Sequence, residues 1–153
     1  MNAEKRTFLQ KQLLPAIAAI PSDKPPLWGK MTLQQMAEHF SESVRIASGR
    51  LLVREIFTPE ENLSKMRDFL ASDKPFRENT QNPLVPNIPA PVKNPSMAKA
   101  LQELDEEILY FFEYFKKHPQ NTTRNPFFGD LNFDQNVQLL YKHALHHLKQ
   151  FGA

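Results

Sequence analysis

Three of the chain's five histidines fall within five residues, in the stretch LLYKHALHHLKQFG at residues 139–152. Two histidines spaced i, i+4 lie on one face of an α-helix, so His143 and His147 can each direct a nitrogen at one ion, about 2.0–2.1 Å away. Such a pair can also lie near a helical core with its nitrogens hydrogen-bonded to backbone or water. The spacing therefore leaves two interpretations open, a metal site and a pair of packed histidines.

The apolar pattern of this stretch separates its three histidines. Each residue of an α-helix turns by about 100°, and apolar side chains recur on one face between residues 133 and 151. His147 falls inside this apolar stripe, and His143 falls on its edge, one turn earlier. His146 lies farther round the helix, among polar neighbours. We expect His143 and His147 to point at the same place and His146 to lie outside their cluster.

A third ligand would have to come from another helix, and His39 in MTLQQMAEHFSESV is the candidate. It lies at the flank of that helix's apolar stripe, much as His143 flanks its own. The two flanks can face each other if the helices are neighbours. The remaining histidine, His118, stands before a proline at a helix end, where a cation near the helix C-terminus is the simple interpretation.

Four long segments with helical periodicity must position these side chains, at about residues 9–20, 32–48, 97–115 and 133–151. Pro15 is expected to kink the first segment or to mark a break in it. In the third segment the apolar residues step by alternating fours and threes, the pattern of a helix packed lengthwise against others. Strand patterns are absent. We therefore predict an all-α fold, a four-helix bundle with a long Pro-rich crossover between the second and third helices.

The crossover at residues 49–94 differs in composition from the helices. Its first half predicts one or two short helices, such as Pro59 to Leu70. Its second half, DKPFRENTQNPLVPNIPAPVKNP, carries six prolines and indicates an ordered or semi-extended surface segment rather than a strand. The chain has 153 residues, of which 41% are hydrophobic, enough for one compact core. We predict a single domain over residues 1–153.

Two stretches resemble each other at an offset of 100 residues. LWGKMTLQQ at residues 27–35 and FFGDLNFDQ at residues 127–135 share a Gly, an apolar residue, a Thr or Asn and a Gln in the same order. The pattern predicts a helix entrance in which Thr32 or Asn132 caps the helix and the Gln three residues later closes a capping box. Each entrance leads into a helix that carries histidine. Two alternative explanations account for this similarity: the same capping arrangement arose independently in the two stretches, or one stretch is an internal duplication of the other.

Composition narrows the classes of function. The 19 basic and 17 acidic side chains nearly cancel and are scattered, so no basic stripe predicts a nucleic-acid partner. The chain has no cysteine, so thiol chemistry would need an external thiol, and its four glycines leave little room for a phosphate-binding loop. The most apolar run, residues 13–20, is too short to span a bilayer. We expect a cytoplasmic protein without a membrane partner.

The residues around the histidines resemble a known family. GKMTLQQMAEHF, followed by a last helix ending HALHHLKQF, is similar to the DinB-like superfamily of metal-binding four-helix bundles. In that superfamily a histidine of the second helix and a His-x-x-x-His pair of the last helix hold a divalent metal. The resemblance implies that His39, His143 and His147 are metal ligands, and Gln150 matches a glutamine that commonly follows the pair. The Pro-rich crossover is closer to an uncharacterised branch than to the studied enzymes.

The resemblance also implies a function. Characterised relatives, such as bacillithiol transferases and mycothiol-dependent enzymes, use the metal to bind the sulfur of a low-molecular-weight thiol. We therefore expect a metal-dependent transferase that acts with such a thiol on a small-molecule substrate. Three imidazoles leave a coordination position open and favour Zn or Ni as the metal. As in the family, a homodimer formed through a bundle face is expected.

Two other functions stay open. A metal-dependent hydrolase would need a general base, and HALHH lacks the Glu that follows the first histidine in H-E-x-x-H metalloproteases. Asp130 or Asp134, near the entrance to the last helix, is the candidate base, because Glu38 and Glu42 project away from His39 on the helical wheel. The other is a non-catalytic metal-binding or small-ligand-binding domain. A structural metal site would be closed by a fourth protein ligand, whereas a catalytic site would face a cleft.

Overall fold

The computed structural model describes residues 2–78 and 88–153, and most of them are helical. The all-α prediction is confirmed at this level. In chain order the elements are α1 (Ala3–Thr7), a π-helical turn η1 (Phe8–Gln12), α2 (Leu13–Ala18), α3 (Leu33–Ser48), α4 (Glu60–Ala71), α5 (Met97–Lys117), β1 (Thr123–Asn125), β2 (Gly129–Leu131) and α6 (Phe133–Gln150). None of these helices is both long enough and apolar enough to cross a membrane.

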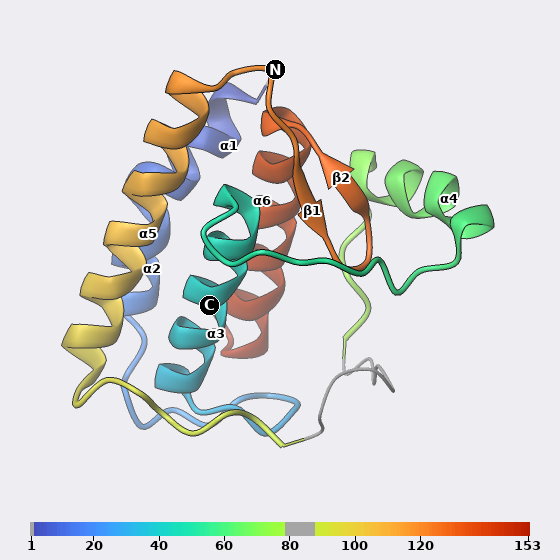
Figure 1. The fold of residues 1–153 in the computed structure, drawn as a ribbon. Helices are drawn as coiled ribbons and strands as arrows, with labels where there is room; N and C mark the ends of the chain where they lie inside the picture. The colour runs from blue at the N-terminus through green and yellow to red at the C-terminus, as the bar shows by residue number, and fades with distance from the viewer. Residues whose placement is uncertain (1, 79–87) are drawn as a thin grey trace.

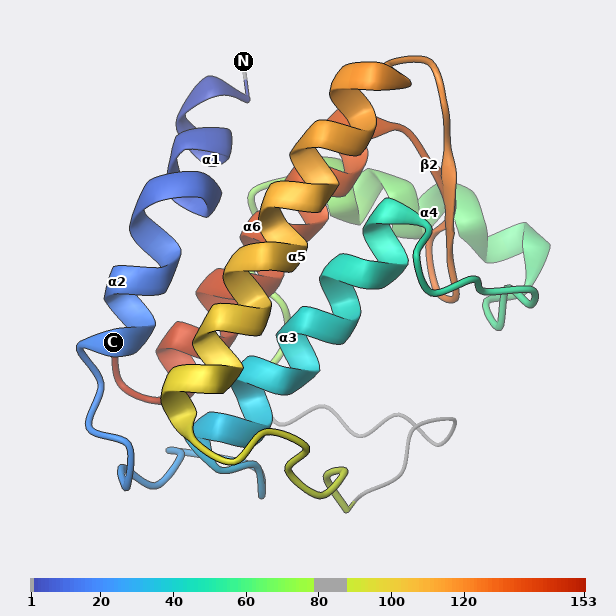
Figure 2. The ribbon, with the colours of Figure 1, turned by 60° about the vertical axis from the view of Figure 1, so that its left-hand side comes forward.

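One hydrophobic core joins the N-terminal helices to α3, α5 and α6, which lie side by side in both ribbon views (Figure 1, Figure 2). Its largest fully buried side chains include Leu13, Phe40, Phe111 and Phe151. These residues lie on the apolar faces that the sequence periodicity predicts. Removal of those faces from water is the main contribution that stabilises the packed helices.

Pro15 does not end the first helical segment. Proline has no N–H to donate to the carbonyl four residues earlier, and its ring crowds that carbonyl. The turn just before α2 is the π-helical η1, in which hydrogen bonds span five residues and the turn is wider. Leu9, Leu13 and Ile17 are nevertheless buried. The wider turn accommodates the proline while the segment keeps its apolar face toward the core.

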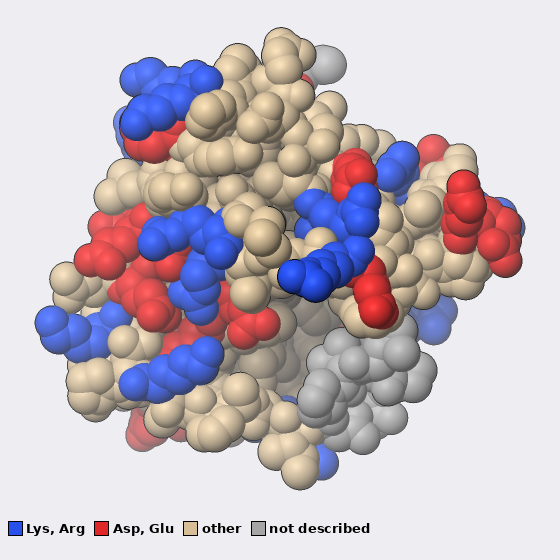
Figure 3. All heavy atoms as spheres, in the orientation of Figure 1, with Lys and Arg blue, Asp and Glu red and all other residues tan. Residues whose placement is uncertain are grey.

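A cluster of charged side chains ties α3 to α5 outside the core. Arg45 Nη1 donates to one carboxylate oxygen of Glu107 at 3.1 Å, and Arg50 Nη1 donates to the other at 3.1 Å. The Arg50 guanidinium also lies 4.4 Å from the centroid of the Tyr110 ring. Figure 3 shows acidic and basic side chains interspersed over the face that it draws. Neither sign of charge dominates that face.

The helix α4 packs beside α6, outside the main core. Leu70, at the C-terminal end of α4, is buried against Phe128 and Leu131. Lys142 Nζ of α6 donates to the backbone carbonyl of Phe69 at 2.7 Å. Burial lowers the pKa of Lys142, whereas the charge of the Asp73 carboxylate opposes this effect. This contact fixes the point at which the chain leaves α4.

The structure contains a short β-hairpin that the sequence analysis did not predict. The strands β1 and β2 pair antiparallel, with Asn125 opposite Gly129. The Asn125 side chain accepts the backbone N–H groups of Phe127 and Phe128 at 2.9 and 3.1 Å, and Gly129 adopts a φ of 81°. Strands of three residues are too short to display alternating polarity, so side-chain hydrogen bonds and a left-handed glycine define the turn.

The crossover from α3 to α5 includes α4, which confirms the predicted short helix. Later in the crossover, residues 88–95 hold no helix or strand, while residues 79–87 of the predicted Pro-rich surface segment lie outside the described residues. Glu38 of α3 holds the later part, because its carboxylate accepts the backbone N–H groups of Lys93 at 2.7 Å and Asn94 at 3.0 Å. Burial raises the pKa of Glu38, but these hydrogen bonds outweigh burial and lower it overall.

Both predicted capping boxes are present. Thr32 Oγ1 accepts the N–H of Gln35 at 3.1 Å, and Gln35 Oε1 accepts the Thr32 N–H at 2.9 Å. At the start of α6, Asn132 and Gln135 form the same reciprocal pair, with both bonds at 2.9 Å. These bonds satisfy N–H groups that have no partner within the helix. The two helices that carry the candidate ligands therefore begin with the same arrangement.

Replacing Asn132 with Ala removes the cap of α6, and we expect the free energy of unfolding to fall by about 1 kcal/mol. Asn132→Asp keeps an acceptor at the same place and adds a negative charge at the helix N-terminus, so its stability should match or exceed that of the wild type. Urea unfolding followed by circular dichroism measures both variants. Equal stability of the Ala and Asp variants would contradict the capping role.

Candidate metal centre

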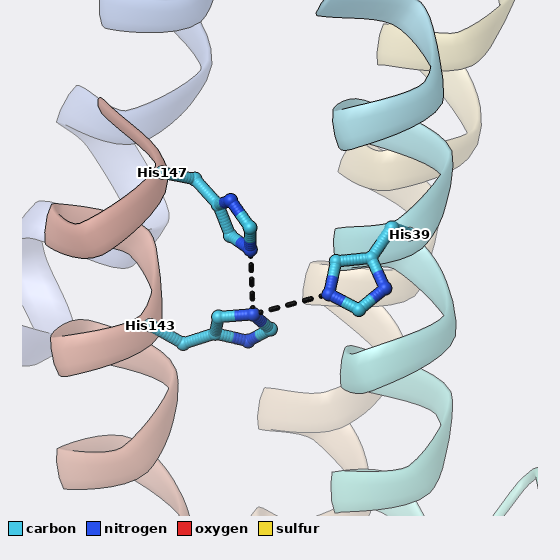
Figure 4. Close-up of side chains that lie close together, drawn as sticks. All are labelled: His39, His143 and His147. Carbon is cyan, nitrogen blue, oxygen red and sulfur yellow. Dashed lines mark hydrogen bonds between the residues drawn. The ribbon is translucent and has the colours of Figure 1, made fainter. Parts of the chain in front are cut away.

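The three predicted ligands meet between α3 and α6. His39 projects from α3, and His143 and His147 project from α6 one turn apart (Figure 4). His143 Nε2 lies 3.2 Å from His39 Nε2 and 2.7 Å from His147 Nε2. One nitrogen of each ring lies within 4.8 Å of the other two. The structure thus brings together the histidine trio, His39, His143 and His147, that the sequence predicts.

These separations suit a metal ion as well as hydrogen bonds. A ring nitrogen of a neutral imidazole is either a donor or an acceptor, so His143 Nε2 serves two close neighbours with at most one hydrogen. Three Zn–N bonds of tetrahedral geometry would place their nitrogens roughly 3.3 Å apart. The separation between His39 and His143 agrees with this value, and the pair His143 and His147 would open by about half an ångström to reach it.

Burial keeps the trio neutral. Removal from water lowers the pKa of His143 well below its ordinary value, and the neighbouring imidazoles lower it further. Burial likewise lowers the pKa of His147 to about 3. The pKa of His39 is also lowered by burial, although the Glu42 carboxylate opposes this effect. Neutral imidazole is the form that binds a metal, so the trio is in its ligand form at neutral pH.

The trio is open on one side. His147 is only 5% exposed and His143 is half-buried, whereas His39 is exposed. The rings of Phe40 and Phe76 lie 5.2 and 6.3 Å from that of His143 and cover it. An external ligand would approach from the side of His39.

Gln150 is a site residue to which the sequence analysis assigned no role. Its Oε1 lies 2.8 Å from His147 Nδ1, and its Nε2 donates to the Trp28 carbonyl at 2.9 Å. The spacing of three residues between His147 and Gln150 places both on one face of α6. That spacing is a signal in the sequence, but the contact with Trp28 depends on tertiary structure.

His146 lies outside the trio, as predicted. Its ring packs against Trp28 with centroids 5.6 Å apart and against Phe76 with centroids 6.0 Å apart. Burial lowers the pKa of His146, and a hydrogen bond to the Phe76 backbone opposes that effect. His146 therefore fixes the chain after α4 against α6 beside the trio. His118 follows the last residue of α5, at the helix end where it was expected.

The acidic residues considered as a hydrolytic base have other partners. Asp130 Oδ1 accepts a hydrogen bond from Arg124 Nε at 2.8 Å, and this interaction lowers the pKa of Asp130. Asp134 accepts from Asn2 Nδ2 through its backbone carbonyl at 3.1 Å and its side chain at 3.4 Å. Glu38 holds the crossover. The hydrolase alternative therefore gains no support from these three side chains.

Comparison with known proteins identifies no relative. No family model matches the chain, and neither a curated protein nor a solved structure matches it. The interpretation of the site therefore depends on its residues and their geometry.

The low pKa values of the buried histidines predict that mild acid destabilises the metal-free protein. Unfolded histidine takes up a proton near pH 6.5, whereas folded His147 stays neutral down to about pH 3. The contribution of His147 to stability is therefore complete above pH 6.5 and falls below it by about 1.4 kcal/mol per pH unit. Urea unfolding in EDTA between about pH 7.5 and about pH 5.5 measures this dependence.

This pH range separates the histidines from the carboxylates. The ordinary pKa values of Glu38 and Asp130, 4.5 and 3.8, lie below it, so protonation of these groups contributes little. His147→Gln removes one of the imidazoles that stay neutral in the folded protein. The free energy of unfolding of this variant should therefore change less with pH than that of the wild type. A wild-type free energy of unfolding that stays constant across this range would contradict the lowered pKa values.

Proposed function

We propose that the protein is a divalent-metal-binding four-helix bundle that acts as a metal-dependent transferase with a low-molecular-weight thiol. The observation that carries this proposal is the convergence of three Nε2 atoms, 3.2 Å apart between His39 and His143 and 2.7 Å apart between His143 and His147. Two separate helices supply these atoms, and burial keeps all three rings neutral. Such a donor set suits a divalent cation.

The donor set supports an open site rather than a closed structural one. Three imidazoles account for three positions of a tetrahedral site. No fourth His, Cys, Asp or Glu joins the trio among the described residues, and residues 79–87 contain none of these types in their sequence. A further position would therefore be free for an external ligand on the side of His39. Imidazole donors favour Zn or Ni, which are the metals we propose.

The partners of Asp130 and Glu38 favour the transferase over the hydrolase. A bound divalent cation lowers the pKa of a thiol and so supplies a thiolate without a protein base. Asp130 is engaged by Arg124, and Glu38 is engaged by the crossover backbone. The trio would hold the cation, and Phe40 and Phe76 would limit access of water to His143.

We also propose that the fold is that of an uncharacterised branch of the DinB-like superfamily. The shared core of the N-terminal helices, α3, α5 and α6, together with the long connection from α3 to α5, supports a four-helix bundle with a crossover. The order of the histidine helices, α3 and then α6, agrees with the family pattern. The partners that we propose are a small-molecule substrate and a second copy of the chain.

Metal content tests the site directly. Untagged protein purified without added metal should carry about one divalent ion per chain by elemental mass spectrometry. His143→Ala should lose the ion, because it removes the central ligand. His146→Ala, a matched histidine change on the same helix, should keep it. The metal proposal is wrong if the wild type carries no ion and takes up neither Zn nor Ni at micromolar concentration.

Thiol transfer needs a separate measurement. Metal-loaded protein is incubated with a cysteine-containing low-molecular-weight thiol and an aromatic chloride, and the thioether product is followed by chromatography. We expect product above the uncatalysed background from wild type and His146→Ala, and background only from EDTA-treated protein and His143→Ala. Binding of one ion without turnover of any thiol in a panel would favour the non-catalytic alternative.

A further inference from the structure

Gln150, whose side chain is buried, connects the trio to the loop before α3. Its side chain is 4% exposed, with Oε1 facing His147 Nδ1 and Nε2 facing the Trp28 carbonyl. Its own backbone carbonyl accepts the N–H of Leu27 at 2.7 Å. The side chain and the backbone of Gln150 therefore bind the same short loop, which fixes the side chain from two directions.

The contact with Trp28 determines the orientation of the amide. A carbonyl oxygen only accepts hydrogen bonds, so the Gln150 group that faces Trp28 must be the donor Nε2. A rotated amide would direct Oε1 at the Trp28 oxygen and lose the bond. The adjacent Gly29 has no side chain and so leaves space for this amide, since a Cβ at that position would lie 2.9 Å from Gln150 Nε2. Oε1 is thus directed at His147.

The orientation of the amide in turn determines the tautomer of His147. Oε1 accepts hydrogen bonds only, so the hydrogen of the 2.8 Å contact belongs to His147 Nδ1. A neutral imidazole carries one hydrogen on its nitrogens, and His147 Nε2 is therefore left with its lone pair. That lone pair is directed toward His143 Nε2, 2.7 Å away, in the centre of the trio.

We infer that Gln150, oriented by the Trp28 carbonyl, is a positioning residue that holds His147 in the Nδ1–H tautomer and prepares its Nε2 to bind the metal. Hydrogen bonds from outside the ligand shell orient histidine ligands in this way, and their loss typically lowers metal affinity about 10–100-fold. The part of the inference that concerns metal affinity rests on the proposed function. The part that concerns the tautomer applies to the metal-free protein as well.

Two substitutions of Gln150 and one control test the inference. Gln150→Leu removes both hydrogen bonds, whereas Gln150→Glu keeps an acceptor for His147 Nδ1. Gln102→Leu makes the same chemical change at an exposed glutamine of α5. Nitrogen-15 NMR of the imidazoles in EDTA at about pH 8 reports the tautomer of neutral histidine. Competition with a chromophoric chelator reports Zn affinity, and urea unfolding confirms that each variant is folded.

The expected results separate positioning from a general structural role. Wild type and Gln150→Glu should have His147 in the Nδ1–H tautomer, and Gln150→Leu should lose the preference. Zn affinity should fall about 10–100-fold in Gln150→Leu and stay near the wild-type value in Gln102→Leu. Gln150→Glu should lose less affinity than Gln150→Leu, because it keeps the acceptor for His147 Nδ1 and loses only the donor to the Trp28 carbonyl. An unchanged tautomer in Gln150→Leu, or an equal loss of affinity in the Leu and Glu variants, would overturn the inference.

The same experiment distinguishes this inference from the proposed function. If wild type binds no Zn but Gln150→Leu still changes the tautomer, the positioning of His147 stands and the metal proposal fails. If wild type binds Zn and Gln150→Leu binds it equally well with an unchanged tautomer, the metal site stands and the role of Gln150 is wrong.

Gly29→Ala tests the contact between the Trp28 loop and Gln150 without any change in the sequence of α6. The φ of Gly29 is 80°, where a side chain is strained, and the new Cβ would displace the Gln150 amide. We expect weaker Zn binding than in wild type while the variant stays folded. Gly49→Ala is the matched control, since its φ is also 80° but its Cβ would meet the Thr123 side chain at 3.5 Å, an ordinary van der Waals distance. Equal Zn affinity of the two glycine variants would contradict the proposal that the Trp28 loop orients Gln150.

Discussion

The close approach of three neutral imidazoles, with nitrogens 2.7 and 3.2 Å apart, is a constraint that the rest of the structure must satisfy. Each ring gives up water to reach this place, and lone pairs that face one another repel unless a hydrogen or a cation lies between them. Helices that could slide or rotate would separate the rings. The relative position of α3 and α6 must therefore be fixed by interactions elsewhere, and the common core, with Phe40 and Phe151 fully buried, supplies them.

The segments outside this core act on the same region. Lys142, next to His143 in sequence, binds the end of α4 and so directs the following chain toward Phe76 and His146. Glu38, next to His39, binds the backbone of the later crossover. Each ligand helix therefore uses the residue beside a ligand to hold part of the connection between α3 and α5. Lys142 and Glu38 therefore join the connection to the helix positions next to His143 and His39.

The trio could be predicted because helix geometry is rigid. A spacing of four residues and the position of His39 at the flank of an apolar stripe specify directions in space once two helices pack. The hydrogen bond from Gln150 to Trp28 joins residues 122 apart in sequence, and no local pattern predicts such a contact. The β-hairpin was missed because its strands have three residues each. The π-helical turn before Pro15 was foreseen only as a kink or break, since the sequence does not reveal how a helix accommodates a proline.

The two capping boxes have a consequence for the direction in which each histidine ligand points around its helix axis. His39 is seven residues after its cap Thr32, and His143 and His147 are eleven and fifteen residues after Asn132. At about 100° per residue, all three side chains lie within roughly 80° of one another when each angle is counted from its own cap. One residue inserted between cap and histidine would rotate a ligand by about 100° and carry it out of the trio. The same insertion before the cap would leave the direction of the histidine around its helix unchanged. The position of each cap therefore determines the direction in which the ligands of that helix point.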